Sequence, residues 1–203
     1  MKRIGALTLM LLILVAVPFG SVDRDIIVEW QKALVYCNYH SQSITTGFFV
    51  SPDGIIATAL HLVKDWVIFV NGFHIFVVTH EKNRPYKARV LGFNQKQDIL
   101  FLQINYRPKV WFDKFEDAKN GQACIALGFP YGWRIALEAK IITNFRSELM
   151  GIDKVPEKGA SGSVILSGGG KVLGMLTHRY GYAGITPSIF IASGLKAIKG
   201  GGK

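Results

Sequence analysis

The chain has 203 residues, enough for one domain with a substantial core or for two small subdomains that share an interface. Its 22 glycines exceed average usage and its charged fraction of 19% is low, which argues against long solvated helices and favours short strands joined by tight turns. The net charge of +10 is spread out, and its densest stretches lack the interleaved aromatic residues of a single-strand nucleic-acid platform, so no nucleic acid partner is expected.

The first segment of the chain, residues 1–21, has the form of an export signal. Two cationic residues precede an uncharged run at 4–20, whose lack of a polar face disfavours a buried helix of the domain. Pro18 and Phe19 stand where a cleavage site needs small residues, and the run is at the lower limit for spanning a bilayer. We therefore expect an exported protein, either released into the periplasm or outside the cell, or tethered to the membrane by an uncleaved segment.

Residues 22–111 consist mainly of short apolar or alternating runs at hairpin spacing. A helix at 25–34 is expected before them, and a helical turn at 60–64 among them. The runs are rich in β-branched and aromatic residues, and turn signals such as SPDG and NG separate them. We therefore predict strands at 47–50, 55–60, 66–70, 73–79, 88–93 and 98–104.

A polar stretch at 112–122 interrupts this rhythm and is expected to connect two halves of the chain. In the second half, residues 123–203, the segment SGGGK predicts a hairpin loop between two further strands. The strands predicted there are 123–129, 134–142, 163–167, 172–177 and 188–193. The fold class is therefore all-β, with two small antiparallel barrels or sandwiches side by side.

Cys37 and Cys124 are the only cysteines, too few for a disulfide scaffold. An oxidising compartment would allow one bridge between them, and two buried free thiols are the alternative. The histidines and cysteines show no CxxC or HxxxH spacing, so we expect neither a metal site nor a cofactor.

A serine between two glycines raises the question of catalysis. Ser161 lies in EKGASGSVIL, and an activated serine needs a base, an acid that orients the base, and backbone N–H groups aimed at an oxyanion. The elbow of α/β-hydrolases is excluded because Ser163 stands where that elbow requires glycine. The chain order His, Asp, Ser remains available.

His61 and Asp98 are the candidates for base and acid. His61 stands at the end of a predicted strand, where a helical turn begins, and Asp98 opens an apolar strand, where its carboxylate needs a partner. Alone, the two would be an ordinary strand-end histidine and a capping residue. The other histidines and acids, in weaker or more polar contexts, are His40, His74, His80, His178, Asp113, Asp117 and Asp153.

Four blocks together resemble the trypsin-like peptidase family, most closely the protease domain of HtrA/Deg-type proteins and related minimal bacterial or viral members. The blocks are TGFFVSPDGIIATALHLV, KQDILFLQI, ALGFPYG, and GASGSVIL followed by KVLGMLT, in the family's order. The resemblance implies a chymotrypsin-like fold of two six-stranded antiparallel Greek-key barrels with the active site between them. Residues 22–111 would form the first barrel, 112–122 the connector and 123–203 the second barrel.

The resemblance also implies roles for these residues. His61 would be the general base, Asp98 its orienting acid and Ser161 the nucleophile of peptide hydrolysis through an acyl-enzyme. The backbone N–H groups of Gly159 and Ser161 would form the oxyanion hole. By position, four residues would line the primary pocket and the edge strand that pairs with substrate: Val155, Thr177, His178 and Arg179.

Three details limit the resemblance. The family commonly has glycine where Ser163 stands, and asparagine or aspartate where Ala160 stands, which leaves the register of this loop open. Position 155 holds no acid, which argues against a preference for Lys or Arg. His178 and Arg179 would either read an acidic side chain or point to solvent.

The leading hypothesis is an exported or membrane-tethered serine endopeptidase that acts on a protein or peptide substrate. The alternative is a catalytically silent trypsin-like fold that binds peptides or proteins, because the sequence does not show whether the three residues meet within hydrogen-bond reach. A basic membrane-associated structural protein would require the triad match to be accidental.

Overall fold

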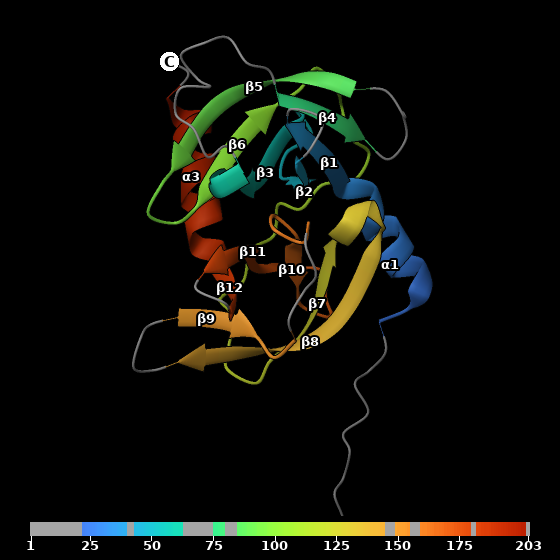
Figure 1. Ribbon diagram of the computed structural model, residues 1–203, viewed down its shortest axis with the longest axis vertical. Coiled ribbons are helices and arrows are strands. Elements are labelled where there is room, and N and C mark those ends of the chain that lie inside the picture. The colour runs from blue at the N-terminus through green and yellow to red at the C-terminus, as the bar shows by residue number, and fades with distance from the viewer. Residues whose placement is uncertain are drawn as a thin grey trace, which may run out of the picture.

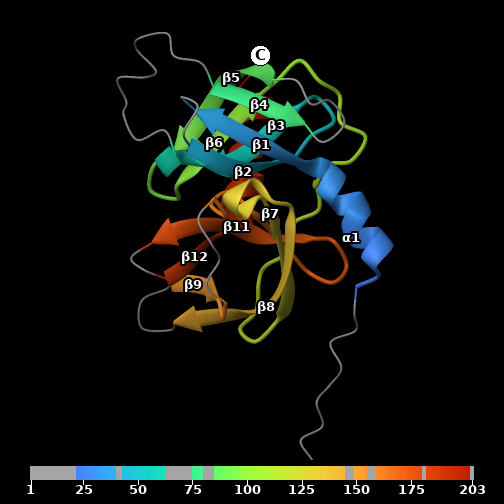
Figure 2. The same ribbon diagram turned by 45° about the vertical axis from the view of Figure 1, so that its right-hand side comes forward.

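Two closed six-stranded antiparallel barrels make up most of the molecule (Figure 1). The computed structural model describes residues 22–39, 43–62, 75–79, 85–144, 149–154, 159–179 and 182–201. The two barrels confirm the predicted all-β, chymotrypsin-like fold. Figure 2 shows the barrels one above the other, with β2 on the side of the first barrel that faces the second.

The first barrel closes in the strand order β1-β2-β3-β6-β5-β4. Its strands are β1 (Leu34–Tyr39), β2 (Ser43–Phe49), β3 (Ile55–Ala59), β4 (Ile75–Thr79), β5 (Pro85–Asn94) and β6 (Ile99–Gln103). Before it come α1 (Arg24–Trp30) and the 3-10 turn η1 (Gln31–Ala33), and the turn η2 (Leu60–Leu62) follows β3. The predicted helix at 25–34 is therefore largely correct, whereas the predicted strand at 66–70 lies outside the described residues.

The second barrel closes in the order β10-β11-β12-β9-β8-β7. Its strands are β7 (Ala123–Gly128), β8 (Ile135–Asn144), β9 (Leu149–Ile152), β10 (Val164–Leu166), β11 (Val172–Arg179) and β12 (Tyr182–Pro187), with the turn η3 (Pro130–Gly132) between β7 and β8. The predicted SGGGK hairpin joins β10 to β11. Strands β1, β9 and β12 were not predicted, because polar residues and glycines interrupt their short apolar patterns.

The prediction of a strand at 188–193 is wrong, because this segment begins the helix α3 (Ser188–Gly200). Ile191 and Leu195, four residues apart, are buried, whereas Ile189 is 55% exposed. This is the spacing of one helix face, and a six-residue apolar run is too short to distinguish it from a strand. The composition argued against long helices, and this helix of 13 residues departs from that expectation.

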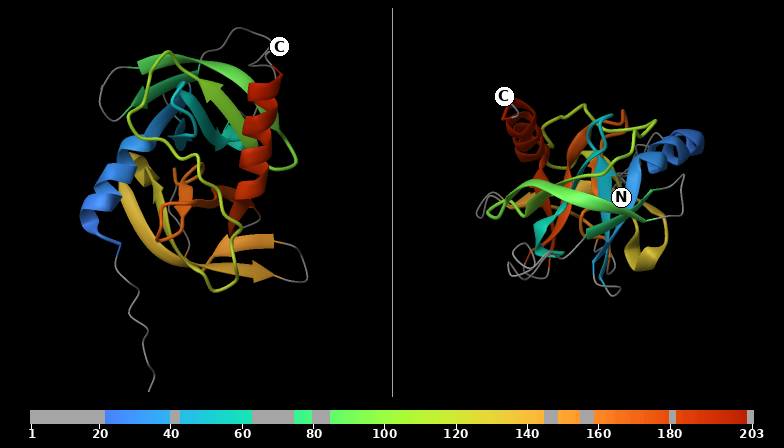
Figure 3. Two further views of the ribbon diagram at one scale, coloured as in Figure 1. Left: turned by 180° about the vertical axis from the view of Figure 1, so that it is seen from behind. Right: turned by 90° about the horizontal axis from the view of Figure 1, so that it is seen from above.

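The two terminal helices connect the barrels crosswise. Trp30 of α1, which precedes the first barrel, packs on the hairpin of the second, where a Cβ at Gly170 would lie 2.6 Å from the indole ring. Helix α3, which follows the second barrel, packs on the first, where a Cβ at Gly194 would lie 2.6 Å from the Phe101 ring (Figure 3). Each helix thus fixes the position of one barrel relative to the other.

The buried apolar residues form one cluster inside each barrel and a third cluster between the barrels. β3 is buried at all five positions because one of its faces points into its own barrel and the other towards the second barrel. β5 alternates between exposed and half-buried residues over most of its length because its outer face meets water. The cluster between the barrels includes Leu34, Phe48, Ile99, Phe101, Ile125, Leu127, Val164, Met175, Ile191 and Leu195.

Cys37 and Cys124 are buried free thiols, one inside each barrel. Burial raises the pKa of both thiols to about 12. Of the two alternatives for these cysteines, the structure therefore has the free thiols.

No helix in the described part of the chain is long and apolar enough to span a bilayer. The export signal expected at residues 1–21 lies outside that part.

Candidate active site

Three of the predicted site residues meet at the junction of the two barrels. The Nδ1 atom of His61 lies 2.6 Å from Oδ2 of Asp98, and its Nε2 atom lies 3.1 Å from Oγ of Ser161. With Nδ1–H donating to the carboxylate, Nε2 is left to accept the serine proton. One imidazole therefore links a carboxylate of the first barrel to a hydroxyl of the second.

The pairing of β3 with β6 brings His61 and Asp98 together. Ala59 at the end of β3 lies opposite Ile99 at the start of β6, so the residues just beyond these ends are neighbours. The backbone N–H of His61 donates to Oδ1 of Asp98 at 2.7 Å, and the backbone N–H of Leu60 donates to the Asp98 carbonyl at 3.1 Å. The carboxylate therefore holds both the main chain and the ring of His61.

Asp98 is the last residue of the turn before β6, and not the first residue of the strand as predicted. Its φ of 55° is in the left-handed region, which Asp and Asn tolerate better than most other residues. Its side chain is 14% exposed and that of His61 is 31% exposed. The turn thus directs a largely buried carboxylate towards the imidazole.

The main chain at Ser161 is held by the first barrel. The Ser161 carbonyl accepts hydrogen bonds from the backbone N–H of Thr46 at 3.1 Å and from Oγ1 of Thr45 at 2.5 Å. Gly162 follows with a φ of 82°, and a Cβ there would lie 1.9 Å from the Thr46 carbonyl oxygen. Only glycine fits this close approach of loop and strand.

Thr46 of β2 is the centre of a buried polar network behind the loop. Its Oγ1 accepts the backbone N–H of Phe129 at 2.8 Å, and its carbonyl accepts the Thr58 hydroxyl at 2.7 Å. Ser163 is 2% exposed, and its hydroxyl oxygen lies 3.5 Å from Thr46 Oγ1. Thr46 was not among the predicted site residues, although it is the first residue of the TGFF block, which was a usable signal.

The two departures from the family pattern are both accommodated by packing. Ser163 fills the space beside Gly128, where a Cβ would lie 1.8 Å from the serine Oγ. Ala160 is 4% exposed and belongs to the cluster inside the second barrel. Neither side chain competes with Ser161 for His61.

The backbone N–H groups of Gly159 and Ser161 remain available for a ligand. Within the part of the chain that the structure describes, neither group donates to a protein acceptor. Gly159 has a φ of 90°, and a Cβ there would lie 3.1 Å from the Phe129 carbonyl oxygen and from the Tyr131 backbone nitrogen. The left-handed backbone and the close approach therefore both favour glycine where the loop passes this segment.

The residues expected to contact substrate are described only in part. Val155 lies outside the described residues, as do His40, His74 and His80, and for His178 and Arg179 only the backbone is described. Thr177 is buried, and its Oγ1 lies 3.4 Å from the Gly184 carbonyl oxygen. β11 pairs with β12 as far as Arg179 but with β10 only as far as Met175. Residues 177–179 thus have one edge that no described strand covers.

No group of three or more His, Cys, Asp or Glu side chains suited to a metal ion occurs among the described residues.

Comparisons with known proteins agree with this architecture. A family model described as trypsin-like peptidase domain matches residues 45–175. A Pseudomonas fluorescens protein named "Probable periplasmic serine endoprotease DegP-like" is 27% identical over 180 residues, covering 80% of this chain and 36% of the relative. A protein of the same name from Chlamydia pneumoniae is 31% identical over 143 residues, covering 65% of this chain and 28% of the relative.

The crystal structure of the serine endoprotease from Yersinia pestis matches with a TM-score of 0.71 at 19% identity, covering 87% of this chain and 66% of that chain. This likeness concerns the fold. The chain spans about a third of the length of the curated relatives it matches.

Proposed function

The chain belongs to the trypsin-like peptidase family, and we propose that it is a serine endopeptidase that hydrolyses peptide bonds of protein substrates. The observation that carries the proposal is the position of the His61 ring, 2.6 Å from the Asp98 carboxylate and 3.1 Å from the Ser161 hydroxyl. Distances of this size place the nucleophile and the orienting acid each within hydrogen-bond reach of the base, on opposite nitrogens of its ring.

The first chemical step forms an acyl-enzyme. Ser161 Oγ attacks the carbonyl carbon of the scissile bond while His61 Nε2 takes the hydroxyl proton. Asp98 keeps the imidazole in the tautomer with Nδ1 protonated and stabilises the imidazolium that forms. The tetrahedral intermediate then collapses, and His61 returns the proton to the leaving amine.

The second step is hydrolysis of the ester. His61 Nε2 removes a proton from water, which attacks the acyl carbon. The bond from that carbon to Ser161 Oγ then breaks, and His61 returns the proton to Ser161 Oγ as the acid product leaves. In both steps negative charge develops on the former carbonyl oxygen. The backbone N–H groups of Gly159 and Ser161 are our candidates to stabilise it, because no described protein acceptor uses them.

The open edge of residues 177–179 is our candidate for binding the extended substrate. An extended peptide can add to an uncovered strand edge through main-chain hydrogen bonds. Thr177, His178 and Arg179 would then flank the substrate, with Val155 in the primary pocket. The absence of an acid at 155 argues against selection of Lys or Arg.

We also propose the domain boundaries and the location. Barrels at 22–111 and 123–203 with a connector at 112–122 are supported by the end of β6 at Gln103 and the start of β7 at Ala123. Export is supported by the leader pattern and by the word periplasmic in the names of the relatives. Whether residues 1–21 are removed or act as an anchor is decided by N-terminal mass spectrometry.

Labelling with a fluorophosphonate probe tests the proposed function. The full chain is expected to label, and Ser161→Ala and His61→Ala are expected to abolish labelling, because the probe reacts with an activated serine. Ser193→Ala, which removes an exposed serine on α3, is the matched control and should label normally. A folded parent that does not label would favour the alternative, a trypsin-like fold that binds peptides without cleaving them.

A further inference from the structure

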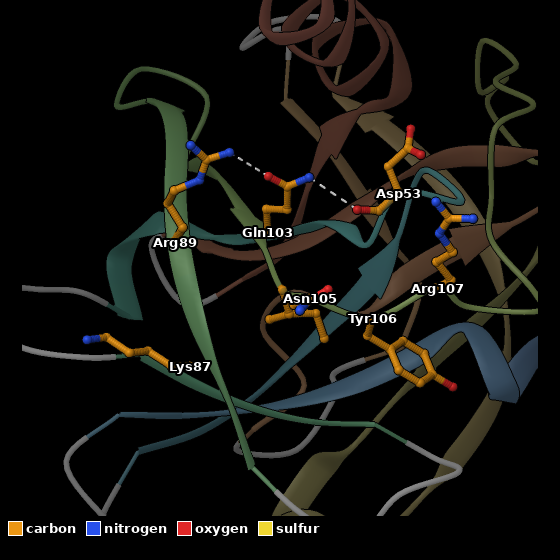
Figure 4. A pocket seen from close by; sticks show the side chains of 8 residues that line it. Asp53, Lys87, Arg89, Gln103, Asn105, Tyr106 and Arg107 are labelled. Carbon is orange, nitrogen blue, oxygen red and sulfur yellow. Dashed lines mark hydrogen bonds between the residues drawn. The ribbon is translucent and has the colours of Figure 1, made fainter.

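A basic pocket of about 510 Å³ lies on the outer surface of the first barrel (Figure 4). Its lining includes three cationic side chains, from Lys87 and Arg89 of β5 and from Arg107 beyond β6, and one carboxylate, from Asp53. All four residues are exposed. None of the three cations forms a salt bridge with a carboxylate of the described residues, so the pocket has an excess of positive charge.

The pocket exists because α3 covers only part of the outer face of β5 and β6. At the covered part, Ile198 of α3 lies 3.7 Å from a Cβ built at Gly92, and Gly194 packs on Phe101. Arg89 and its cross-strand partner Gln103 lie beyond this cover. The outer face of the two strands therefore changes from apolar contacts beneath the helix to cations in water.

Arg89 is held in place by neutral partners. One guanidinium nitrogen donates to Oε1 of Gln103 at 2.6 Å, and Nε2 of Gln103 donates to the Asp53 carbonyl oxygen at 3.2 Å (Figure 4). The Asp53 carboxylate in turn accepts the Ser51 hydroxyl at 3.2 Å. Arg89 therefore presents further N–H donors in a defined position, which lowers the entropy lost on binding an anion.

The pocket is separate from the triad, although both lie at ends of β6. Asp98 precedes β6 at Ile99, whereas Gln103 ends the strand at the pocket. Four residues at about 3.3 Å each put these strand ends about 13 Å apart. A ligand in the pocket therefore does not occupy the place of the scissile bond.

We propose that this pocket binds an acidic segment of a protein substrate, remote from the bond that is cleaved; this rests on the proposed function. Lys87 and Arg89 are two residues apart on one strand face, a spacing of about 7 Å, and carboxylates at alternate positions of an extended chain have the same spacing. The volume accommodates several side chains. Among the described residues of the lining, Tyr106 is the one aromatic side chain, and a single ring does not provide a stacking platform for successive bases.

Binding of an acidic peptide is measured with the Ser161→Ala chain, which lacks the proposed nucleophile and therefore leaves the probe intact. The probe is fluorescein-labelled hexaglutamate, followed by fluorescence anisotropy at low ionic strength. We expect the variant Lys87→Ala/Arg89→Ala/Arg107→Ala to bind about tenfold more weakly, since each exposed ion pair contributes a factor of about two to five. Added salt should weaken binding to the parent.

The matched control removes the same charge elsewhere. Lys119→Ala/Lys140→Ala/Lys154→Ala replaces three exposed lysines that do not line the pocket, and it should stay within about twofold of the parent if local contacts dominate. Equal weakening in both triple variants would overturn the proposal, as would failure of the parent to bind. Oligothymidylate of equal charge is the comparison probe. If it binds as tightly as hexaglutamate and loses affinity in the pocket variant, the assignment to acidic polypeptide is overturned. The single variant Arg107→Ala, outside the strands, repeats the test without altering the barrel.

A second experiment links the pocket to cleavage. Two substrates share one cleavable segment and carry either a glutamate-rich or a glutamine-rich tail. The pocket variant should raise KM about tenfold for the acidic tail alone and leave kcat unchanged, because the lost contacts hold substrate and transition state equally. Equal KM changes for both tails would contradict the proposal. Failure of fluorophosphonate labelling would contradict the proposed peptidase function alone, because anisotropy reports the pocket independently.

Discussion

The two barrels contribute to the candidate site in different ways. The first barrel supplies His61 and Asp98 from the adjacent ends of two paired strands, and every contact between them lies within that barrel. The second barrel supplies Ser161 from a loop, and the Ser161 carbonyl oxygen accepts hydrogen bonds from β2 of the first barrel. The base and acid are thus a local product of one sheet, whereas the nucleophile is placed by contacts between sheets.

This difference predicts separable effects of substitution. Changes at His61 or Asp98 should remove activity with little effect on how the barrels pack. Changes in the contacts of Thr46 and Gly162 should weaken the junction of the barrels and, through it, the approach of Ser161 to His61.

Asp98→Asn should lower kcat/KM for a peptide substrate by about a thousand- to ten-thousandfold, because an amide in place of the carboxylate favours the wrong tautomer of His61. The melting temperature should change little, since the amide oxygen can still accept the His61 backbone N–H. Asp113→Asn is the matched control, because the exposed Asp113 accepts the indole N–H of Trp111 at 3.1 Å and has no contact with His61 among the described residues. A comparable activity loss in the control would remove the special role of Asp98.

Gly162→Ala should destabilise the protein by about 2–4 kcal/mol and abolish labelling of Ser161, because the new Cβ clashes with Thr46 in a left-handed backbone. Gly121→Ala is the control: its φ of 75° is similar, but a Cβ there meets nothing within 4 Å. Its expected cost is about 1 kcal/mol. Urea unfolding measures the loss of unfolding free energy in both variants. Equal losses would mean that backbone strain, and not the contact between the barrels, causes the destabilisation.

Thr46→Val should cost about 1–3 kcal/mol, because the backbone N–H of Phe129 loses its buried acceptor. Thr46→Ser keeps a hydroxyl in place and should recover most of that stability. Urea unfolding gives the free energies, and fluorophosphonate labelling rates report the position of Ser161. If Val and Ser behave alike, the hydrogen bond to Phe129 does not support the junction.

Alkylation of the two thiols is expected to show the smallest effect, and because one thiol lies in each barrel it compares the barrels directly. Neither Cys37 nor Cys124 should react with iodoacetamide near neutral pH in the folded protein, since both are buried and their pKa is raised from 9.0 to about 12. In a pulse during unfolding, equal rates at the two sites indicate that the barrels unfold together. Faster labelling of one site would show that its barrel opens first.

The raised pKa values of the two thiols also predict that the free energy of unfolding depends on pH. Because the folded state favours the protonated thiols, the stability they contribute is present below pH 9 and is lost as the pH rises towards 12. Reductant should leave the melting temperature unchanged, because both cysteines are free. A lower melting temperature in reductant would indicate a disulfide and contradict this arrangement.

Several features of the fold could be predicted from local sequence patterns. Alternating apolar runs and turn signals predicted most strands, and the glycine-flanked serine, the strand-end histidine and the aspartate before an apolar strand were identified by residue type. The segment at 188–193 was misread because its apolar run also fits one face of a helix, and the partner surface on β5 and β6 that favours the helix is far away in the chain.

The sequence by itself determined the all-β class, the division into two halves and the chemical types available for the site, because these depend on neighbours along the chain. Only the tertiary structure decided that His61 and Ser161, 100 residues apart, lie 3.1 Å from each other, that Thr46 holds the serine loop, and that three separate cations line one pocket. Such contacts depend on strand register and on packing between barrels, and no short stretch of sequence contains both partners.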